Sequence, residues 1–339
     1  MQKIRFKPND KWDLNYGFHY SATSDYPRYD RLLRTRNGNP RSAEWNYGPQ
    51  IWIMNNISLS QNGPGTLYDE FTLRLAHQFF EESRMDRDFM DPLRRNRTEK
   101  VNAFSVNMDL HKEVNRRHLF YYGVEYVWND VYSRGRSENI NSSVSMESSS
   151  RYPMASWASA GAYLNYQYRI SSDVLVQSGL RYSHFGIEAK FDNDYYPVDI
   201  ESASMNKGAL TGSLGLVFNP GDNWSLSTNL ATGFRFPNVD DMGKIFDSEP
   251  GAVVVPNPNL EAEYAYNFDL GLARVFGSYM KIDLTAYYTL LNNALVRRDF
   301  SLNGLDSMLY DGEMSRIQAV QNAAQARVYG LQAGLEVKL

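Results

Sequence analysis

The sequence predicts an all-β chain that forms a transmembrane antiparallel β-barrel. Three observations lead to this fold class. Apolar and polar residues alternate with a period of two in one run after another, which is typical of strands with unlike faces. The connections between these runs alternate between short and long, as in barrels with short periplasmic turns and long extracellular loops. Aromatic residues are abundant, with 24 Tyr, 17 Phe and 6 Trp, and such residues favour strands and the belts at membrane interfaces.

The alternation is clearest between residues 224 and 290. Every second residue of 264–272 and of 280–290 is apolar or aromatic, and the residues between them are polar or small except Tyr287. In a soluble sandwich the apolar face would be a core. In an outer-membrane barrel the apolar face contacts lipid and the polar face lines the lumen. One hairpin does not distinguish the two, so the whole chain must be considered.

About thirteen strands are expected, joined as hairpins. Their approximate ranges are 3–7, 12–20, 51–59, 71–79, 103–110, 120–128, 158–170, 174–182, 210–218, 224–234, 264–272, 280–290 and 328–339.

The connections are sorted by length. Short ones lie near residues 8, 62, 115, 172, 221 and 277, and long ones near 30, 90, 143, 199, 248 and 309. The charged stretch 81–100 is read as one of the long connections. Soluble sandwiches and propellers have no reason to sort their loops in this way, and their strands average only about 5–6 residues. The sorting therefore favours a membrane barrel.

Two polar residues conflict with this assignment. His77 and Asn55 fall on the face expected to contact lipid. A charged group at the membrane midplane would cost about 2–4 kcal/mol, and a neutral His or Asn should cost less. A β-bulge could also turn either residue inward.

Composition excludes several classes. The 339 residues are 42% hydrophobic with a net charge of −4, too small to indicate a nucleic-acid partner. The mean hydropathy is −0.52, and no run approaches the roughly 20 apolar residues of a membrane-spanning helix. With no Cys, there are no disulfides or thiolate metal sites. Residues 1–7 lack the apolar core of a signal peptide, so we expect the true N-terminus of an exported protein to lie upstream.

Two short sequence boxes flank the long connection near residue 248. The first is Phe234-Arg235-Phe236-Pro237-Asn238, and the second is Asn257-Pro258-Asn259-Leu260, followed by Glu263. Their order and spacing resemble the paired boxes of TonB-dependent outer-membrane receptors. In that family an FRAP-like box ends one strand, and an NPNL-like box followed by Glu starts the next. Here Phe236 replaces the usual small residue. Residues 328–336 resemble the family's following strand.

The resemblance implies a barrel of about 22 strands around an N-terminal plug. It also implies TonB-energised uptake of a scarce solute, most often a ferric siderophore, with haem or cobalamin as alternatives. Residues 1–339 are then expected to be a fragment of the barrel domain, with the plug domain absent. The implied location is the outer membrane of a Gram-negative cell. The implied partners are outer-membrane lipid, an iron chelate or similar small solute, and the TonB complex through the missing plug.

Several residues are candidates for binding the solute. Arg74, Arg169, Arg181 and Arg235 are expected to project into the lumen, where guanidinium groups bind anionic chelates or plug carboxylates. The alternative is pairing with lumen acids such as Glu125 and Asp269. Aromatic side chains could stack on an aromatic siderophore or form the outer aromatic belt. This set comprises Tyr26, Tyr29, Trp45, Tyr195 and Tyr196.

No metal, cofactor or catalytic site is predicted. The five histidines form no metal-binding pair, and none lies between Phe234 and Leu260, where a haem receptor of this family would be expected to carry one. The acidic residues of the long connection are Asp240, Asp241, Asp247 and Glu249. They lack a calcium-loop spacing and are read as a solvated loop. Ser183 and His184 are adjacent in a strand and point to opposite faces, so no enzyme is expected.

Three functions remain in order of preference. The first is a TonB-dependent receptor barrel. The second is a plugless, passive, porin-like barrel, and the third is a soluble β-rich glycan-binding or enzymatic domain.

Overall fold

The computed structural model describes residues 1–36, 38–192, 194, 200–243, 245–249, 251–310, 312–322 and 325–338. Within this part, regular structure is almost entirely β, and the helices α1 (Tyr29–Leu32) and α2 (Val239–Gly243) are single turns. No helix of the described residues has the length and apolarity needed to span a membrane.

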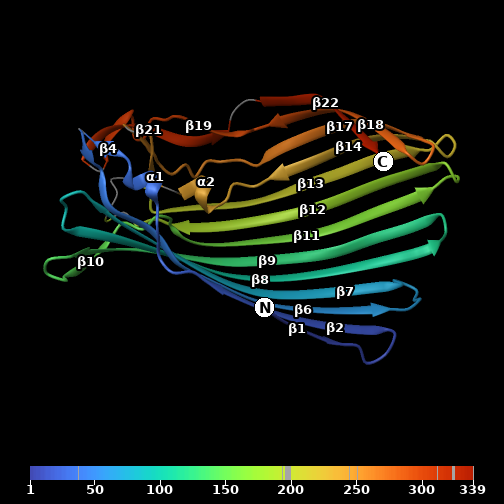
Figure 1. Cartoon of the computed structure of the whole chain (residues 1–339), viewed down its shortest axis with the longest axis horizontal. Helices are drawn as coiled ribbons and strands as arrows, with labels where there is room; N and C mark the ends of the chain where they lie inside the picture. Colours follow the sequence, from blue (N-terminus) through green and yellow to red (C-terminus); the bar gives the residue numbers. More distant parts are fainter. Residues whose placement is uncertain are drawn as a thin grey trace.

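One large sheet contains most of the chain (Figure 1). Among the described residues it has fifteen strands, of which β3 (Tyr26–Pro27) and β10 (Ser145–Ser148) lie off the main path. The thirteen on the path pair in sequence order and antiparallel, which confirms the expected number of hairpin-linked strands. They are β1 (Gln2–Phe6), β2 (Trp12–Ala22), β6 (Ser42–Asn62), β7 (Glu70–Asp88), β8 (Leu93–Asn115), β9 (His118–Asn139), β11 (Met154–Arg169), β12 (Val174–Lys190), β13 (Ser202–Phe218), β14 (Trp224–Arg235), β17 (Glu263–Phe276), β18 (Met280–Asn292) and β22 (Gln325–Val337).

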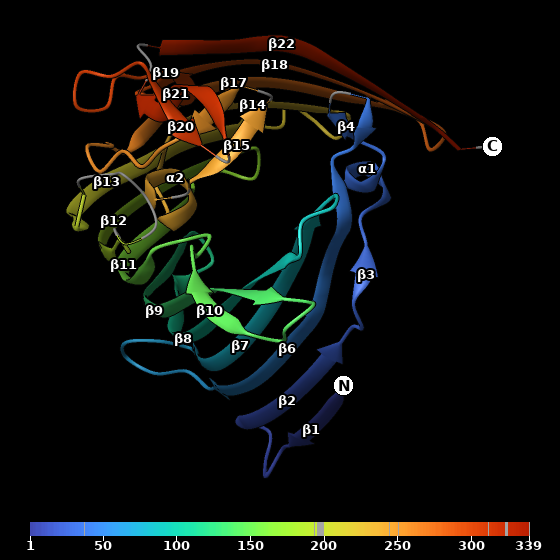
Figure 2. The ribbon, with the colours of Figure 1, turned by 90° about the vertical axis from the view of Figure 1, so that its left-hand side faces the viewer.

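The large sheet curves into an open arc (Figure 2). Among the described residues, the edge strands β1 and β22 each pair with one neighbour, β2 and β18 respectively. The short turns gather at one end of the strands and the long connections at the other (Figure 1). Several of the long connections fold over the concave side of the arc, where α2 also lies (Figure 2).

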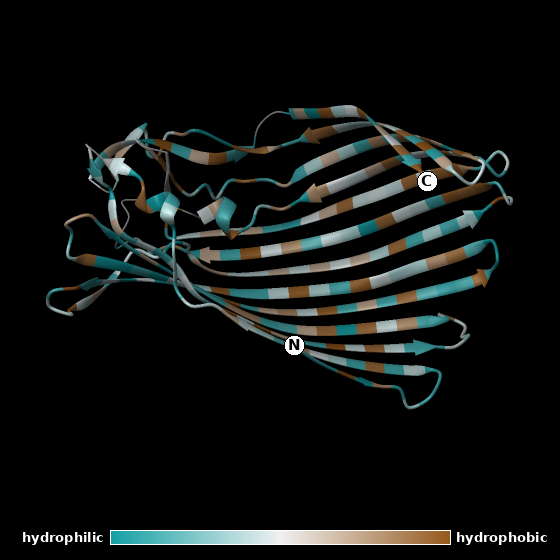
Figure 3. Ribbon diagram, viewed as in Figure 1, coloured by the Kyte–Doolittle hydropathy of each residue, from teal (hydrophilic) through white to brown (hydrophobic). Residues whose placement is uncertain are grey.

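The convex face of the arc is apolar and exposed. Because directly paired residues share a face, the pairing of Leu214 with Leu230, and of Leu230 with Phe268, joins apolar side chains across three strands. These three residues are 53%, 55% and 42% exposed. Figure 3 shows the matching alternation of brown and teal along each strand. An apolar surface of this extent is what a lipid-facing barrel wall requires.

His77 and Asn55 remain on the convex face. They pair directly with each other, and His77 also pairs with Phe104 of β8. The register shifts of β6 lie nearer the start of the strand, between Ser42 and Glu44 and between Tyr47 and Gln50. No bulge therefore turns His77 or Asn55 inward. The Tyr16 hydroxyl donates to Asn55 Oδ1 over 2.8 Å, and the His77 ring stacks on Phe104 at 4.5 Å. His77 Nε2 also lies 3.4 Å from Asn102 Oδ1, so the polar groups of both residues have partners on the same face.

The prediction that residues 81–100 form a long connection is wrong. Strand β7 continues to Asp88 and β8 begins at Leu93, so the two form one long hairpin. Cross-strand ion pairs stabilise this extension, including Arg95 with Asp86 at 2.7 Å and Lys100 with Glu81 at 3.3 Å. The apolar alternation ends where the strands leave the lipid-facing band, and opposite charges then support the same ladder in water.

In the part of the chain that the structure describes, a second sheet of five strands lies within the long connections. It consists of β15 (Phe246–Glu249), β16 (Ala252–Val254), β19 (Leu295–Asp299), β20 (Ser307–Tyr310) and β21 (Glu313–Asn322). A separate small hairpin joins β4 (Thr35–Arg36) and β5 (Asn39–Pro40). The second sheet has its own buried core around Val253, Val255 and Ile317. It is therefore a folded cap rather than a loose set of loops.

Candidate functional site

The box loop, residues 236–262, is anchored on the concave face of β12 and β13. Val239, Met242 and Leu260 of this loop pack against Ile187 of β12 and Met205 of β13. Met242 and Ile187 are 0% and 2% exposed. This cluster identifies the concave face by contact, since the alternate residues of the same strands lie on the exposed convex face. Apolar burial holds the loop in the lumen.

The first box ends β14 with an ion-pair clamp. Arg235 pairs directly with Glu263 in the ladder between β14 and β17. Arg235 Nη1 donates to Glu263 Oε2 over 2.9 Å, and Nη2 donates to Asp241 Oδ2 over 2.5 Å. The hydrogen bond to Glu263 raises the pKa of Arg235. Glu263 also accepts the backbone N–H of Leu295 over 2.6 Å, so this one carboxylate joins three segments.

The residues after Arg235 start α2. Asp241 N–H donates to Asn238 Oδ1 over 2.9 Å, and Asn238 N–H donates to Asp241 Oδ2 over 3.0 Å. This reciprocal arrangement is a capping box. Phe236 stacks on Phe185 at 5.0 Å and meets Phe234 edge-on at 4.8 Å. The large side chain that departs from the family pattern therefore fills the cluster beneath the box loop.

The second box ties α2 to the cap. Asn257 Nδ2 donates to the Val320 carbonyl over 2.8 Å, and Asn257 Oδ1 accepts the Asn259 N–H over 3.1 Å. The Asn257 N–H donates to the Met242 carbonyl over 3.1 Å. Leu260 is 4% exposed. Around these residues, Pro237 and Pro256 are fully buried, Pro258 is half-buried and Asn259 is exposed.

Sequence reasoning missed Asn322. Its Nδ2 donates to the carbonyls of Glu261 (3.0 Å) and Asn293 (2.7 Å), and its Oδ1 accepts the Glu261 N–H over 2.9 Å. These contacts link the end of β21 to the second box across 61 residues of sequence. Asn322 belongs to no recognisable motif, so no local signal identifies it.

The concave wall nearer the short-turn end carries a row of polar side chains. Arg74 is paired with Asp109, which also accepts the Tyr163 hydroxyl over 2.5 Å. Arg181 is paired with Glu125. The guanidinium of Arg181 lies close over Gly161, where an added Cβ would meet it. These side chains are thus paired with one another along the wall.

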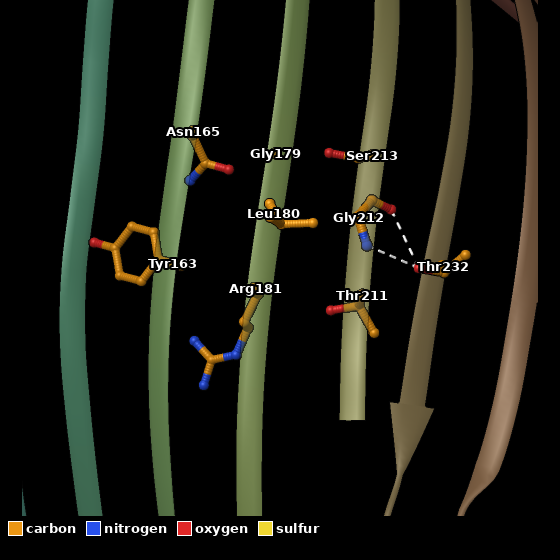
Figure 4. Close-up of a pocket in the computed structure, with 9 residues that line it drawn as sticks. All are labelled: Tyr163, Asn165, Gly179, Leu180, Arg181, Thr211, Gly212, Ser213 and Thr232. Atoms are coloured by element: carbon orange, nitrogen blue, oxygen red, sulfur yellow. Dashed lines mark hydrogen bonds between the residues drawn. The ribbon is translucent and has the colours of Figure 1, made fainter. Parts of the chain in front are cut away.

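A pocket of about 450 Å³ opens on this wall between β11 and β14 (Figure 4). Its polar lining comprises Tyr163, Asn165, Arg181, Thr211, Ser213 and Thr232. Thr232 stands where the β13–β14 ladder stops. Its Oγ1 accepts the Gly212 N–H over 2.8 Å and donates to the Gly212 carbonyl over 3.3 Å. Hydroxyl, amide and guanidinium groups of this kind can hydrogen-bond an anionic or oxygen-rich solute.

The predicted ligand-binding residues do not converge on one place. Arg181 of β12 lines the pocket, Arg74 lies four strands away on β7, and Arg235 belongs to the box clamp. Arg169 is exposed at the short-turn end of β11, away from the pocket. Arg74, Arg181 and Arg235 already have acidic partners, as expected from the alternative that these arginines pair with acidic residues of the lumen. Tyr195 and Tyr196 lie outside the described residues. A solute-binding role for these six residues stays a prediction.

A group of aromatic residues lies at the long-connection end of the strands. The bulge in β6 brings Tyr47 opposite Arg84, whose guanidinium lies 4.5 Å from the Tyr47 ring centroid. Trp45 packs edge-on against Tyr47 at 5.0 Å, and Tyr26 lies 5.9 Å from it. This group therefore faces the mouth of the lumen, not the lipid belt.

Of the acidic residues in the long connection, Asp241 is occupied by Arg235 and Asn238. The side chains of Asp247 and Glu249 are outside the described part of the chain. The described residues contain no group of His, Asp or Glu arranged to hold a metal ion.

An open arc of long hairpins, apolar outside and polar inside, defines an outer-membrane type of β-barrel wall. The family model described as "TonB dependent receptor-like, beta-barrel" matches residues 3–338. The chain belongs to the TonB-dependent receptor family. Members of that family are integral outer-membrane proteins of Gram-negative bacteria and are receptors or transporters rather than enzymes.

Similar curated proteins are the haemoglobin–haptoglobin utilization proteins B of Neisseria meningitidis. The serogroup A protein is 30% identical over 134 residues, covering 38% of this chain and 16% of that protein. The serogroup C protein is 32% identical over 104 residues, covering 29% and 13%.

Solved structures share the fold. The copper transporter OprC matches with a TM-score of 0.75 at 11% identity, over 99% of this chain and 49% of that one. The siderophore receptor PiuA from Acinetobacter baumannii matches with a TM-score of 0.66 at 15% identity, over 99% and 53%. This chain therefore spans about half the length of the structures that it resembles.

Proposed function

We propose that the protein containing this chain takes up an iron-bearing solute across the outer membrane, with energy from the TonB complex. A ferric siderophore is the first candidate. The observation that carries this proposal is the polar, arginine-containing pocket on the concave wall of a family barrel, at Arg181. Guanidinium groups on an open lumen wall suit an anionic chelate.

We also propose that residues 1–339 form part of the barrel domain and that the remaining strands and the plug complete it. The open edges β1 and β22 support this, because an unpaired strand edge in lipid leaves backbone groups without partners. The coverage of about half of each matched structure also supports it.

Haem iron is the second candidate. The names of the two curated relatives favour it, whereas the absence of His between the boxes favours a siderophore. A passive porin remains the alternative to energised uptake.

Growth on single iron sources tests the proposal. A strain with the intact gene and its deletion mutant are compared on ferric siderophores, on haem and on haemoglobin, each with and without a functional TonB complex. We expect TonB-dependent growth on a ferric chelate only when the gene is intact. TonB-independent uptake would support the passive porin. Growth restricted to haem sources would indicate haem iron, not a ferric siderophore, as the substrate.

A charge substitution tests the pocket. Arg181→Gln is expected to weaken binding of the supporting chelate by about 10-fold to 100-fold, since a charge-assisted hydrogen bond contributes about 1.5–3 kcal/mol. Arg134→Gln is the matched control, because Arg134 pairs with Glu147 at the long-connection end of β9, away from the pocket. The affinities are measured by titration of the purified protein. Equal affinity in the two variants would show that Arg181 does not bind the chelate.

A further inference from the structure

The strap, residues 148–153, begins at the last residue of β10 and crosses the concave face of β8 and β9. Ser148 pairs with Gly135 of β9, and a Cβ on Gly135 would collide with the carbonyl oxygens of Ser148 and Ser149. The Tyr152 N–H donates to Ser133 Oγ over 3.3 Å, and Arg97 Nε donates to the Ser149 carbonyl over 3.4 Å. Figure 2 shows this bright green segment over the mouth of the arc. The strap is therefore folded inward, against the lumen wall.

A buried carboxylate lies beneath the strap. Glu99 of β8 is 6% exposed, and neither of its carboxylate oxygens has a hydrogen-bond partner among the described residues. Its direct neighbour in the ladder is Glu82 of β7. Glu82 is satisfied, since it accepts Arg84 Nη2 over 2.7 Å and Gln50 Nε2 over 2.8 Å. Burying an ionised carboxylate without hydrogen-bond donors costs free energy. Of these two neighbouring glutamates, Glu99 is therefore the one that carries this cost.

Charged groups lie around Glu99 on β7, β8 and the strap. The charged groups that act on Glu99 are Glu82 and Arg84 on β7, Arg97 on β8 and Arg151 on the strap. Ser133 of β9 is its other ladder partner, Gln50 of β6 binds Glu82, and Asp240 of α2 lies beside Tyr152 of the strap. Arg151 Nη1 lies 4.0 Å from Glu82 Oε1, and its guanidinium covers the Tyr152 ring at 4.7 Å. Glu99 lies beside the outward Lys100–Glu81 pair, where the strands leave the lipid-facing band.

Burial raises the pKa of Glu99, and attraction to Arg151 and Arg84 opposes this effect without cancelling it. A carboxylate whose pKa is higher when the strap is docked binds its proton more tightly in that state. Docking is then most stable at low pH, below the ordinary pKa of a glutamate. The stability is lost as the pH rises through the raised pKa of Glu99.

The other end of the strap contacts the box loop. Tyr152 packs beside the apolar cluster under α2, and its hydroxyl hydrogen-bonds with Asp240. Pro153 lies against Gly243, where a Cβ would meet its ring. Release of the strap would therefore remove contacts from both the lumen wall and α2.

We propose that residues 148–153 form a proton-sensitive strap, which is docked in the lumen mouth while Glu99 carries a proton and is released when Glu99 ionises. A docked strap narrows the mouth and supports the box loop. A released strap opens this part of the wall. The proposal does not depend on which solute is taken up.

Amide hydrogen exchange of the strap in the whole purified protein tests this, with Tyr152 as the reporting amide. After correction for intrinsic exchange over a titration from pH 5 to pH 8, protection in the unaltered protein is expected to fall as the pH rises, by up to about tenfold for each unit of the pKa difference. Glu99→Gln should keep the strap protected across this range. Glu138→Gln is the matched control, because Glu138 lies further along β9 beside Arg94, and it should behave like the unaltered protein.

A further variant separates titration from simple packing. Arg151→Gln removes the largest attraction to ionised Glu99, so the remaining pH transition should move to higher pH. Protection that is independent of pH in the unaltered protein would overturn the proposal. So would a Glu99→Gln variant that loses strap protection at both ends of the range while the amides of β8 stay protected.

Discussion

Replacement of Leu270 by arginine is expected to prevent most of the chain from assembling in the outer membrane. Leu270 lies midway along β17 on the convex face, is 52% exposed, and pairs with Thr228 and Ala286. An arginine on the lipid face near the membrane midplane costs about 2–4 kcal/mol. The measurement is the fraction of the whole protein that runs as the folded, heat-modifiable species after extraction from outer membranes.

Asn229→Arg is the matched control for Leu270→Arg. Asn229 pairs directly with Asp269 in the adjoining strand pair, on the concave face, and its Nδ2 lies 3.5 Å from Asp269 Oδ2. A new arginine there meets water and an acidic neighbour, so assembly should be nearly unchanged. If both variants assembled equally well, the apolar face would not be facing lipid.

Leu260→Ala is expected to destabilise the box loop by about 2–5 kcal/mol, the usual cost of removing a buried leucine side chain. Leu260 is 4% exposed within the cluster that holds α2 on β12 and β13. Because the barrel ladder does not depend on this cluster, the loss should be local. Amide exchange of residues 236–262 in the whole protein measures it, with protection in β17 as the internal reference.

The same truncation at an exposed leucine provides the comparison. Leu305→Ala changes a side chain that is 61% exposed and should leave the box loop within about 0.5 kcal/mol of its original stability. A Leu260→Ala variant with unchanged exchange in the box loop would show that the apolar cluster does not hold the boxes in place.

The strand order and the two faces were predictable, because period-two alternation and sorted turn lengths are local signals. The ends of the strands were not. Between residues 81 and 100 the ladder continues through ion pairs such as Arg95 with Asp86, and a charged strand in water resembles a loop in sequence. The bulge beside Tyr47 likewise has no unambiguous sequence signal, yet it decides that the nearby aromatic residues face the mouth.

The boxes were recognisable as sequence, but their physical roles required the structure. Arg235 and Glu263 are ladder partners only because the long connection returns β17 to the side of β14. Asn322 and the strap act across long sequence separations, through Glu261 in one case and Glu99 in the other. Such contacts depend on the assembled sheet, and single-sequence periodicity does not report them.

The most direct test of the lipid-facing wall is a scan of single spin-labelled cysteines through residues 264–272 in the whole protein in bilayers. We expect labels at even positions to collide with lipid-soluble oxygen and labels at odd positions to collide with a water-soluble nickel chelate, with a strict period of two. Even positions that are inaccessible to both reagents would show a packed protein core on that face, and would contradict the barrel wall described above.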